Sequence, residues 1–223
     1  MVIPQGRLFA PVARLLAAAG APVSAADEKR RELVVERDGW RLLFARPRDV
    51  GLFVEAGLGD FGVAGKDTLR EHPRDVVEVL DLAVGRCRLV LAVPADREPL
   101  GPAAVRRVAT KYPSLTAEFL AAAGLDAQVI VMHGAVEAAP RLGLADGVVD
   151  LVQTGATLQA NGLVAVSPIL DSTARLIANP VAFRLRSDAA RAWTERLRQA
   201  AADSAAAYAA AGETLNSGEP RGG

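Results

Sequence analysis

An apolar run followed at once by a polar, glycine-containing turn restricts how residues 147–161 can fold. The run Gly-Val-Val-Asp-Leu-Val predicts a buried strand, and the turn Thr-Gly-Ala-Thr at residues 154–157 predicts the start of a short helix at about Leu158. This order places two hydroxyls and several backbone N–H groups at a helix N-terminus, where the dipole favours negative charge. Asp150 lies just upstream as an acceptor suited to sugar hydroxyls. A phosphate beside a ribose fits this loop, and simple helix capping is the alternative.

Segments with strand character alternate with helical segments along the rest of the chain, which predicts an α/β fold. Residues 33–35 and 40–45 are expected to pair as a hairpin around Asp38-Gly39. Further strands are predicted at residues 2–3, 61–64, 86–93, 107–109, 128–132, 173–178 and 182–185, and helices at 8–19, 47–56, 67–71, 114–123, 135–142 and 189–211. Residues 95–102 read as a polar, proline-rich link.

The composition excludes several classes of protein. The 26 basic and 26 acidic residues balance, so no basic excess indicates nucleic-acid binding. The single Cys87 excludes an internal disulfide, and with two histidines there is no Cys/His cluster spaced for a structural zinc ion. No apolar run approaches the roughly 20 residues of a membrane helix, and the N-terminus lacks signal-peptide features. A cytoplasmic protein is expected.

The residues around the Thr-Gly turn extend its pattern in both directions. The run from Gly134 to Asp150, leading into residues 154–163, resembles the phosphoribosyl-pyrophosphate loop of the ATP phosphoribosyltransferase family. Five further segments resemble the same family in the same order: residues 4–8 (PQGRL), 46–50 (RPRDV), 60–67 (DFGVAGKD), 87–90 (CRLV) and 108–113 (VATKYP). The resemblance runs from about Ile3 to Asn179, which is most of the chain.

The resemblance implies a fold of two α/β lobes of the periplasmic-binding-protein type (type II), with an inter-lobe cleft and two chain crossings. Lobe I would hold residues 1–88 and 172–223, and lobe II residues 89–171 with the loop. The polar, glycine-containing tail at residues 212–223 is expected to be disordered.

The resemblance also implies a reaction. A pentosyltransferase of this family moves the phosphoribosyl group of phosphoribosyl pyrophosphate to N1 of ATP, giving N1-(5-phosphoribosyl)-ATP and pyrophosphate in the first step of histidine biosynthesis. Mg²⁺ would be chelated mainly by the substrate, with no protein ligands of its own. Long members carry a C-terminal regulatory domain, for which no room remains after about Ala211.

The short form implied in this way works with a regulatory subunit resembling histidyl-tRNA synthetase. A hetero-octamer containing homodimers of the catalytic chain is therefore expected.

Residue roles follow from positions that match the family. Thr154, Gly155, Ala156 and Thr157 would hold the 5′-phosphate, and Asp150 would accept from the ribose hydroxyls unless it is only a strand-end carboxylate. Gln153 stands where many members carry an acid.

Basic and acidic residues elsewhere are expected on the nucleotide side. Gly6 and Arg7 would contact polyphosphate, since a guanidinium fork suits phosphate oxygens, although Gln5 replaces a frequent Lys. Arg31 matches an Arg that stabilises the leaving pyrophosphate, either within its own subunit or across a subunit boundary; a solvated charge run is the alternative. Four more residues are candidate ATP or polyphosphate contacts: Lys66, Asp67, Lys111 and Glu137. Asp67 and Glu137 could instead cap their own helices.

Two other functions stay open from the residues alone. One is a non-catalytic two-lobe protein that binds a small molecule, because this fold often binds solutes without chemistry. The other is a phosphoribosyltransferase for another base, against which the Leu-Val-Gln spacing between Asp150 and Thr154 argues, since nucleobase enzymes usually place paired acids there.

Overall fold

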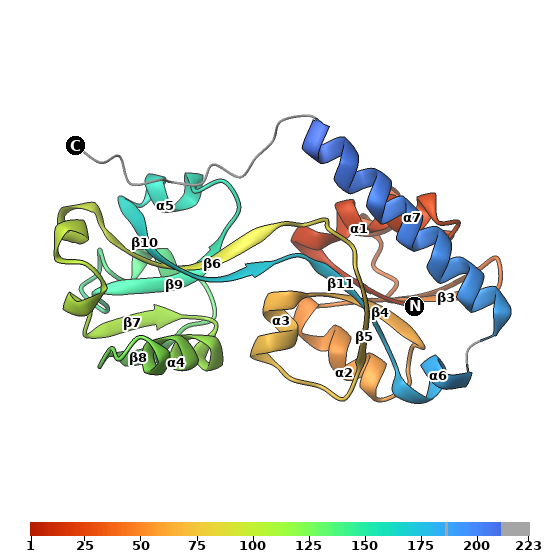
Figure 1. Cartoon of the computed structure of the whole chain (residues 1–223), viewed down its shortest axis with the longest axis horizontal. Coiled ribbons are helices and arrows are strands. Elements are labelled where there is room, and N and C mark those ends of the chain that lie inside the picture. Colours follow the sequence, from red (N-terminus) through yellow and green to blue (C-terminus); the bar gives the residue numbers. More distant parts are fainter. Residues whose placement is uncertain (186, 211–223) are drawn as a thin grey trace. The chain divides into compact units, whose positions relative to one another are not determined.

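The structure is a computed structural model that describes residues 1–185 and 187–210 (Figure 1). The chain divides into two compact units. The first contains Met1–Arg86 and the described residues from Ser172 onward, and the second contains Cys87–Asp171. The chain therefore passes between the units twice. The tail expected at residues 212–223 lies outside the described residues.

The first unit is built on a six-stranded mixed sheet with the order β2-β3-β1-β4-β11-β5. Strand β1 is parallel to both β3 and β4, whereas β2, β11 and β5 join in antiparallel pairs. Its strands are β1 (Val2–Pro4), β2 (Val34–Arg37), β3 (Trp40–Ala45), β4 (Phe61–Gly65), β5 (Val77–Asp81) and β11 (Ala174–Ala178); its α-helices are α1 (Phe9–Ala18), α2 (Val50–Glu55), α3 (Lys66–Glu71), α6 (Pro180–Leu185) and α7 (Asp188–Ala210), with 3-10 turns η1 (Gly6–Leu8), η2 (Ala25–Lys29) and η3 (Pro47–Asp49).

Successive side chains of each strand point to opposite faces of this sheet, and helices pack on both faces. Ile3 packs in the cluster that contains Phe9 of α1 and Leu197 of α7, while its neighbour Val2 packs with Val50 of α2 on the opposite face. Helices α1 and α7 thus share one face, as Figure 1 shows.

The second unit has a five-stranded sheet with the order β10-β6-β9-β7-β8. Strands β7, β8 and β9 are parallel, and β6 is antiparallel to β9. Its strands are β6 (Cys87–Pro94), β7 (Arg107–Thr110), β8 (Gln128–Val131), β9 (Gly147–Val152) and β10 (Leu163–Ser172); its α-helices are α4 (Pro113–Ala122) and α5 (Ala156–Ala160), with 3-10 turns η4 (Ala95–Leu100), η5 (Pro102–Ala104) and η6 (Val136–Ala138). Val148 and Val149 pack on opposite faces of this sheet, so both faces carry a core.

Most predicted elements are confirmed, and the hairpin is a good example. Strands β2 and β3 pair from Val34–Leu43 to Arg37–Trp40, and the turn residues Asp38 and Gly39 have φ values of 50° and 76°. Positive φ at both central residues is what a two-residue hairpin turn requires.

Two predicted elements are wrong. Residues 182–185 belong to helix α6 and not to a strand, because the side chain of Asn179 accepts hydrogen bonds from the N–H groups of Val181 and Ala182 and Pro180 occupies the first turn. Residues 135–142 form only the short turn η6: Ala135 has a left-handed φ of 49°, and Pro140 has no N–H to continue a helix.

Two strands were not predicted, β5 and β10. Strand β10 contains Pro168, which an edge strand tolerates because one row of its backbone groups is unpaired. Across the described residues, no helix has both the length and the apolar character needed to cross a membrane.

Candidate active site

Three parallel strands of the second unit end at the same edge of its sheet, and a predicted site residue lies near or after the end of each. Lys111 follows β7, Glu137 lies in η6 after β8, and Asp150 lies near the end of β9, just before the Thr-Gly loop. The loops after the carboxyl ends of parallel strands are the usual place for ligands in α/β sheets. The topology therefore brings these residues and the Thr-Gly loop to one edge, although 46 positions separate Lys111 from Thr157.

Lys111 and Asp150 form an ion pair that the strand register creates. Thr110 of β7 lies opposite Val149 of β9, so the next residue of each strand is Lys111 and Asp150. The Lys111 Nζ lies 2.7 Å from Asp150 Oδ1. The same Oδ1 also accepts the N–H of Leu151 at 2.7 Å, which fixes the orientation of the carboxylate. The second carboxylate oxygen, Oδ2, is a further acceptor.

A buried threonine pair holds the segment that carries Lys111. Thr110 and Thr116 are fully buried. The Thr110 hydroxyl donates to the Val149 carbonyl at 2.8 Å and accepts the N–H of Tyr112 at 2.9 Å, while the Thr116 hydroxyl donates to the Tyr112 carbonyl at 2.7 Å. These hydrogen bonds tie the ends of β7 and β9 to the first turn of α4. Neither threonine belongs to the predicted site residues. The signal for Thr110 is a polar residue that ends an apolar strand just before a helix that begins with Pro113.

The Thr-Gly loop presents backbone donors in an open position. Gly155 has φ +81°, and a Cβ at this residue would meet no atom within 4 Å, so the left-handed backbone and not a lack of space requires glycine. The first i→i−4 hydrogen bond of α5 runs from the N–H of Gln159 to the Gly155 carbonyl at 3.0 Å. The N–H groups of Ala156, Thr157 and Leu158 therefore precede the helical ladder, and among the residues that the structure describes only that of Ala156 has a side-chain contact, at 3.4 Å from Thr154 Oγ1.

Helix α5 is held by its middle and by its C-terminal end. The buried Leu158 fixes the helix to the core of the second unit, while Thr154, Ala156 and Thr157 are exposed. At the far end, the Asn161 side chain donates to the Thr157 carbonyl at 2.9 Å. The loop is thus a short, anchored segment with exposed hydroxyls and N–H groups, a composition that suits a phosphate.

In the first unit, a second set of predicted residues follows the parallel strands β1 and β4. Gly6, with φ +74°, and Arg7 begin the turn η1 one residue after β1, and Lys66 and Asp67 come directly after β4. Arg7 Nη1 donates to the Gly85 carbonyl at 2.9 Å and stays exposed. Lys66 Nζ pairs with Glu78 at 2.7 Å.

Asp67 is set apart from its neighbours by burial. Its side chain is 3% exposed, and Asp67 Oδ1 accepts the Ser172 hydroxyl at 2.6 Å while the Ser172 Oγ accepts the Asp67 N–H at 3.0 Å. These bonds connect the start of α3 to Ser172, the residue 105 positions away at which the chain returns to the first unit. They give Asp67 a structural function in joining these two segments of the first unit.

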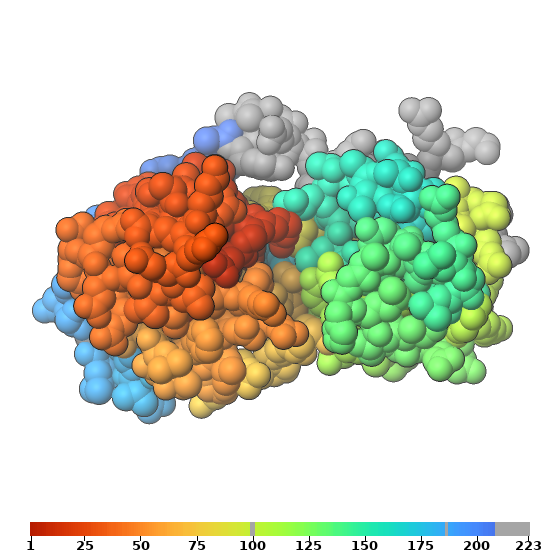
Figure 2. Space-filling view, turned by 180° about the vertical axis from the view of Figure 1, so that it is seen from behind, coloured from red at the N-terminus to blue at the C-terminus, as the bar shows by residue number. Residues whose placement is uncertain are grey.

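Arg31 is exposed and lies three positions before the edge strand β2. The segment that leads into β2 has the orange colour of its sequence position in Figure 2. Because β2 is antiparallel to β3, and β3 is parallel to β1 and β1 to β4, this segment reaches the same edge as Gly6 and Lys66. Within residues 1–185 and 187–210, no hydrogen bond or ion pair engages the Arg31 side chain.

A buried carboxylate anchors the segment before Arg31. Asp27 is 3% exposed and pairs with Arg37 at 3.0 Å and with Arg30 at 2.8 Å. Burial alone would raise the pKa of the Asp27 carboxyl, but the hydrogen bonds from Arg37 and from the N–H of Ser24, with the charges of Arg37 and Arg30, lower it below its usual value.

Glu137 is half-buried in η6. In the part of the chain that the structure describes, no group of three or more His, Cys, Asp or Glu side chains is placed to hold a metal ion.

Comparison with known proteins decides the family. Residues 46–199, more than half of the chain, match the family model described as ATP phosphoribosyltransferase. The chain belongs to the ATP phosphoribosyltransferase family. This membership confirms the resemblance found in the motifs.

Relatives named ATP phosphoribosyltransferase match nearly the whole chain. The protein from Moorella thermoacetica is 45% identical over 210 residues, covering 90% of this chain and 92% of the relative. That from Bacillus subtilis is 41% identical over 190 residues, covering 84% and 88%.

Solved structures agree with the family and the fold. An ATP phosphoribosyl transferase (HisG:HisZ) complex from Thermotoga maritima contains a similar chain, with a TM-score of 0.77, 29% identity and coverage of 91% of this chain and 98% of that one. The periplasmic aliphatic sulphonate binding protein SsuA from Escherichia coli is only 14% identical but has a TM-score of 0.59 over 96% of this chain and 75% of that one. The predicted α/β fold of the periplasmic-binding-protein type is thereby confirmed.

Proposed function

We propose that this chain is an ATP phosphoribosyltransferase that transfers the phosphoribosyl group of phosphoribosyl pyrophosphate to N1 of ATP. Family membership over residues 46–199 supports this assignment, since the matched region includes the Thr-Gly loop, Asp150 and Lys111. The observation that carries the proposal is the arrangement at one sheet edge: an oriented carboxylate next to an open loop of N–H and hydroxyl donors. A sugar phosphate needs both groups, the carboxylate for its hydroxyls and the donors for its phosphate.

In this proposal the second unit binds phosphoribosyl pyrophosphate. The N–H groups of Gly155, Ala156 and Thr157 and the hydroxyls of Thr154 and Thr157 hold the 5′-phosphate. Asp150 accepts from the ribose hydroxyls. Such positioning contributes to catalysis because the reacting atoms must lie in line for attack at C1.

Lys111 has two roles in the proposed site. Its ammonium lies 2.7 Å from Asp150 Oδ1 and helps to hold the carboxylate in place. When ribose hydroxyls occupy Asp150, the flexible stem of Lys111 allows its ammonium to turn toward a substrate phosphate. Lys111 thus balances the charge of Asp150 before binding and the charge of the substrate after it.

The reaction breaks the bond between C1 of the ribose and a pyrophosphate oxygen and forms a bond between C1 and N1 of the adenine. The electron pair of the broken bond leaves with pyrophosphate, and the lone pair of N1 makes the new bond. The protein's part is to hold the two substrates in line and to balance the charge on the leaving group.

Residues of the first unit are proposed to serve the nucleotide and the leaving group. Gly6, Arg7 and Lys66 follow the strand ends of that unit and would contact the ATP polyphosphate, with Glu137 of the second unit as a further nucleotide contact. Arg31, which is exposed, would stabilise the departing pyrophosphate. The burial of Asp67 favours the structural alternative for that residue over direct contact with ATP.

Mg²⁺ is proposed to reach the site on the pyrophosphate of the substrate. Asp150 precedes the loop by four positions and already has an ammonium partner, so the residues present fit an ion bound mostly by phosphate oxygens and water. The bound ion would neutralise negative charge on the pyrophosphate.

A regulatory partner is the second part of the proposal. The similar Thermotoga maritima chain was solved as a HisG:HisZ complex, which supports a hetero-oligomer with a subunit resembling histidyl-tRNA synthetase. A hetero-octamer that contains homodimers of this chain, and a cytoplasmic location, complete the proposal. Sedimentation of the chain mixed with that subunit should show a complex heavier than either component, and sedimentation as two separate species would contradict the partner.

The activity is tested by following N1-(5-phosphoribosyl)-ATP by its ultraviolet absorbance, with ATP, phosphoribosyl pyrophosphate, Mg²⁺ and the regulatory subunit. Replacing Asp150 and Thr157 together by Ala should lower kcat/KM about a thousandfold, as expected when a charged acceptor and a phosphate contact are both lost. Asp126→Ala, which removes an exposed carboxylate of the same unit, should leave kcat/KM unchanged. Absence of product with the wild-type chain would favour a non-catalytic binding protein. Product with another nucleobase but not with ATP would favour a phosphoribosyltransferase for that base.

A further inference from the structure

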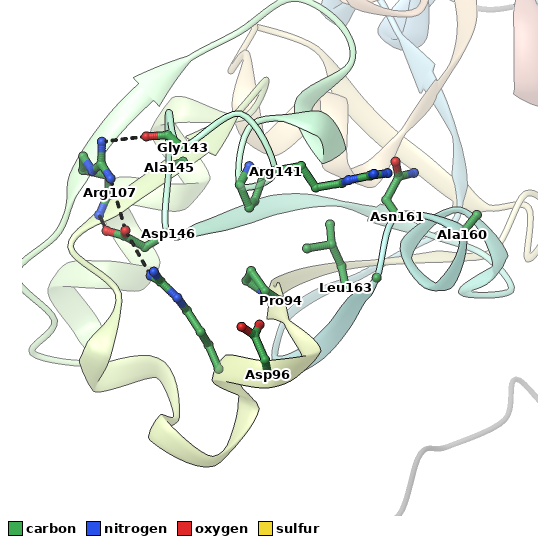
Figure 3. Close-up of a pocket in the computed structure, with 13 residues that line it drawn as sticks. Pro94, Asp96, Arg107, Arg141, Gly143, Ala145, Asp146, Ala160, Asn161 and Leu163 are labelled. Carbon is green, nitrogen blue, oxygen red and sulfur yellow. Dashed lines mark hydrogen bonds and ion pairs between the residues drawn. The ribbon is translucent and has the colours of Figure 1, made fainter.

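A pocket of about 490 Å³ lies in the second unit, at the edge of the sheet opposite the Thr-Gly loop (Figure 3). Arg107 begins β7 and Asp146 immediately precedes β9, whereas Lys111 and Asp150 lie at the other ends of these parallel strands. Strand β6 is antiparallel to β9, so its last residue, Pro94, also reaches this edge. The pocket is therefore separate from the proposed substrate site, although a single sheet carries both.

The floor of the pocket is apolar and its rim is charged. Pro94, Ala145 and Leu163 line it, and Leu163 is 2% exposed. Figure 3 shows Pro94 and Leu163 between Asp96 on one side and Arg141 on the other. Its volume lies in the range of small-molecule sites, which combine apolar walls with a few polar groups.

Two of the three lining arginines are already engaged. Arg107 donates to the Gly143 carbonyl at 3.1 Å and pairs with Asp146 at 3.3 Å, and Arg97 pairs with the same carboxylate at 3.3 Å. Burial would raise the pKa of the Asp146 carboxyl, but hydrogen bonds from Arg107 and from the N–H groups of Arg106 and Arg107 lower it. Asp146 thus remains a charged anchor for both guanidinium groups.

Arg141 differs from these two. Its side chain is exposed and extends along the pocket toward Asn161 in Figure 3. Within the described ranges, it makes no hydrogen bond or ion pair. The five N–H donors of its planar guanidinium are thus available next to the apolar residues of the pocket. This combination suits a ligand that has one carboxylate and is otherwise apolar.

We propose that this pocket binds a small carboxylate with an apolar body, the carboxylate on Arg141 and the body on Pro94 and Leu163. Three arginines against the two carboxylates of Asp96 and Asp146 leave the lining with one net positive charge. Asp96, which is on the opposite side of the pocket from Arg141, disfavours a second negative charge on the ligand.

The pocket is also connected to the Thr-Gly loop through α5. Asn161 lines the pocket, and its side-chain amide holds the carbonyl of Thr157 at 2.9 Å. A ligand that draws the Asn161 side chain toward the pocket therefore removes one of the hydrogen bonds at the end of this five-residue helix, beside those from the Asn161 N–H to the Thr157 and Leu158 carbonyls, and the first residues of the helix belong to the proposed phosphate site. This consequence rests on the proposed function, whereas binding in the pocket does not.

The test uses the full chain and benzoate as the probe, with binding followed by amide chemical shifts in nuclear magnetic resonance spectra. We expect saturable shifts at Asn161 and Leu163 and at Thr157. Acetate, which has the carboxylate but no apolar body, should bind at least about tenfold more weakly, since burying a ring of this size contributes more than 1.4 kcal/mol.

Two substitutions with opposite expected signs complete the test. Arg141→Gln should weaken benzoate binding about tenfold, because one charge-assisted contact is lost. Asp96→Asn should strengthen it, because a repelling charge is removed. Arg14→Gln, which removes an exposed arginine of the first unit, is the matched control and should have no effect.

Shifts that do not saturate, or equal affinities for wild type and Arg141→Gln, would overturn the proposal. Because no substrate is present in these measurements, their outcome is independent of whether the chain transfers a phosphoribosyl group.

Discussion

At the residue scale, the pair Lys111–Asp150 gives the proposed substrate site its charge arrangement. Lys111→Met removes the ammonium that lies 2.7 Å from Asp150 but keeps most of the side-chain volume. We expect KM for phosphoribosyl pyrophosphate to rise about tenfold, the usual effect of losing one charge-assisted contact. Steady-state kinetics measure this change. The control is Lys29→Met, which removes an exposed lysine of the first unit and should leave KM unchanged. Equal KM values for the wild type and Lys111→Met would contradict the proposed role of Lys111.

A second prediction at this scale concerns Asp27 and pH. Its pKa in the folded protein lies below the unfolded value of about 3.8–3.9, so the stabilisation from the charged carboxylate is fully present above that value and disappears as the pH falls through the folded pKa. Asp27→Asn should therefore lower the free energy of unfolding by about 2 kcal/mol at pH 7, and by progressively less below pH ~4.

Urea unfolding at pH 7 and pH 3 measures this difference. Glu32→Gln removes an exposed carboxylate that also pairs with Arg30, and it should change the free energy of unfolding little at either pH. A destabilisation by Asp27→Asn of the same size at both pH values would argue against an ionic contribution.

At the scale of single elements, the Thr-Gly turn and α5 act as one short structural unit. Gly155→Ala places a Cβ on a backbone with φ +81°, which costs about 1–2 kcal/mol or forces the turn to change. Either result should displace the N–H donors, so we expect a higher KM for phosphoribosyl pyrophosphate together with a lower melting temperature.

Gly124→Ala is the matched control for this prediction. Gly124 has φ +64°, follows α4, and would also meet no atom within 4 Å of an added Cβ. Both variants should lose similar stability, but only Gly155→Ala should change KM. An unchanged KM in Gly155→Ala would show that the turn does not bind the phosphate.

At the scale of the whole molecule, the carboxylate pocket and the Thr-Gly loop are expected to communicate through the second unit. Saturating benzoate should raise KM for phosphoribosyl pyrophosphate in the wild type, since drawing the Asn161 side chain away from the Thr157 carbonyl would weaken one of the hydrogen bonds that hold the helix of the phosphate loop. Arg141→Gln should retain the wild-type KM and lose most of the benzoate response. If benzoate binds but leaves KM unchanged, the two sites are energetically independent.

The amino-acid sequence by itself determined the elements whose signals are local. The hairpin around Asp38-Gly39 follows from residues that tolerate positive φ, and the strand, turn and helix of residues 147–160 follow from an apolar run that ends at Thr-Gly. Local signals can also be misread: Asn179-Pro180 already contains the cap that makes residues 180–185 a helix and not the strand expected at 182–185. The motifs between Ile3 and Asn179 likewise sufficed for the family.

Only the tertiary structure decided which distant residues meet. The Lys111–Asp150 pair depends on the parallel register of β7 and β9, and a shift by one position would turn the two side chains to opposite faces. Likewise, Asp67 is predicted as a site residue from its place after a strand, but its contact with Ser172 buries it. Periodicity and caps are set by neighbours along the chain, whereas register and burial are set by the packing of segments far apart in sequence, and for this reason the second kind of information appears only in the folded molecule.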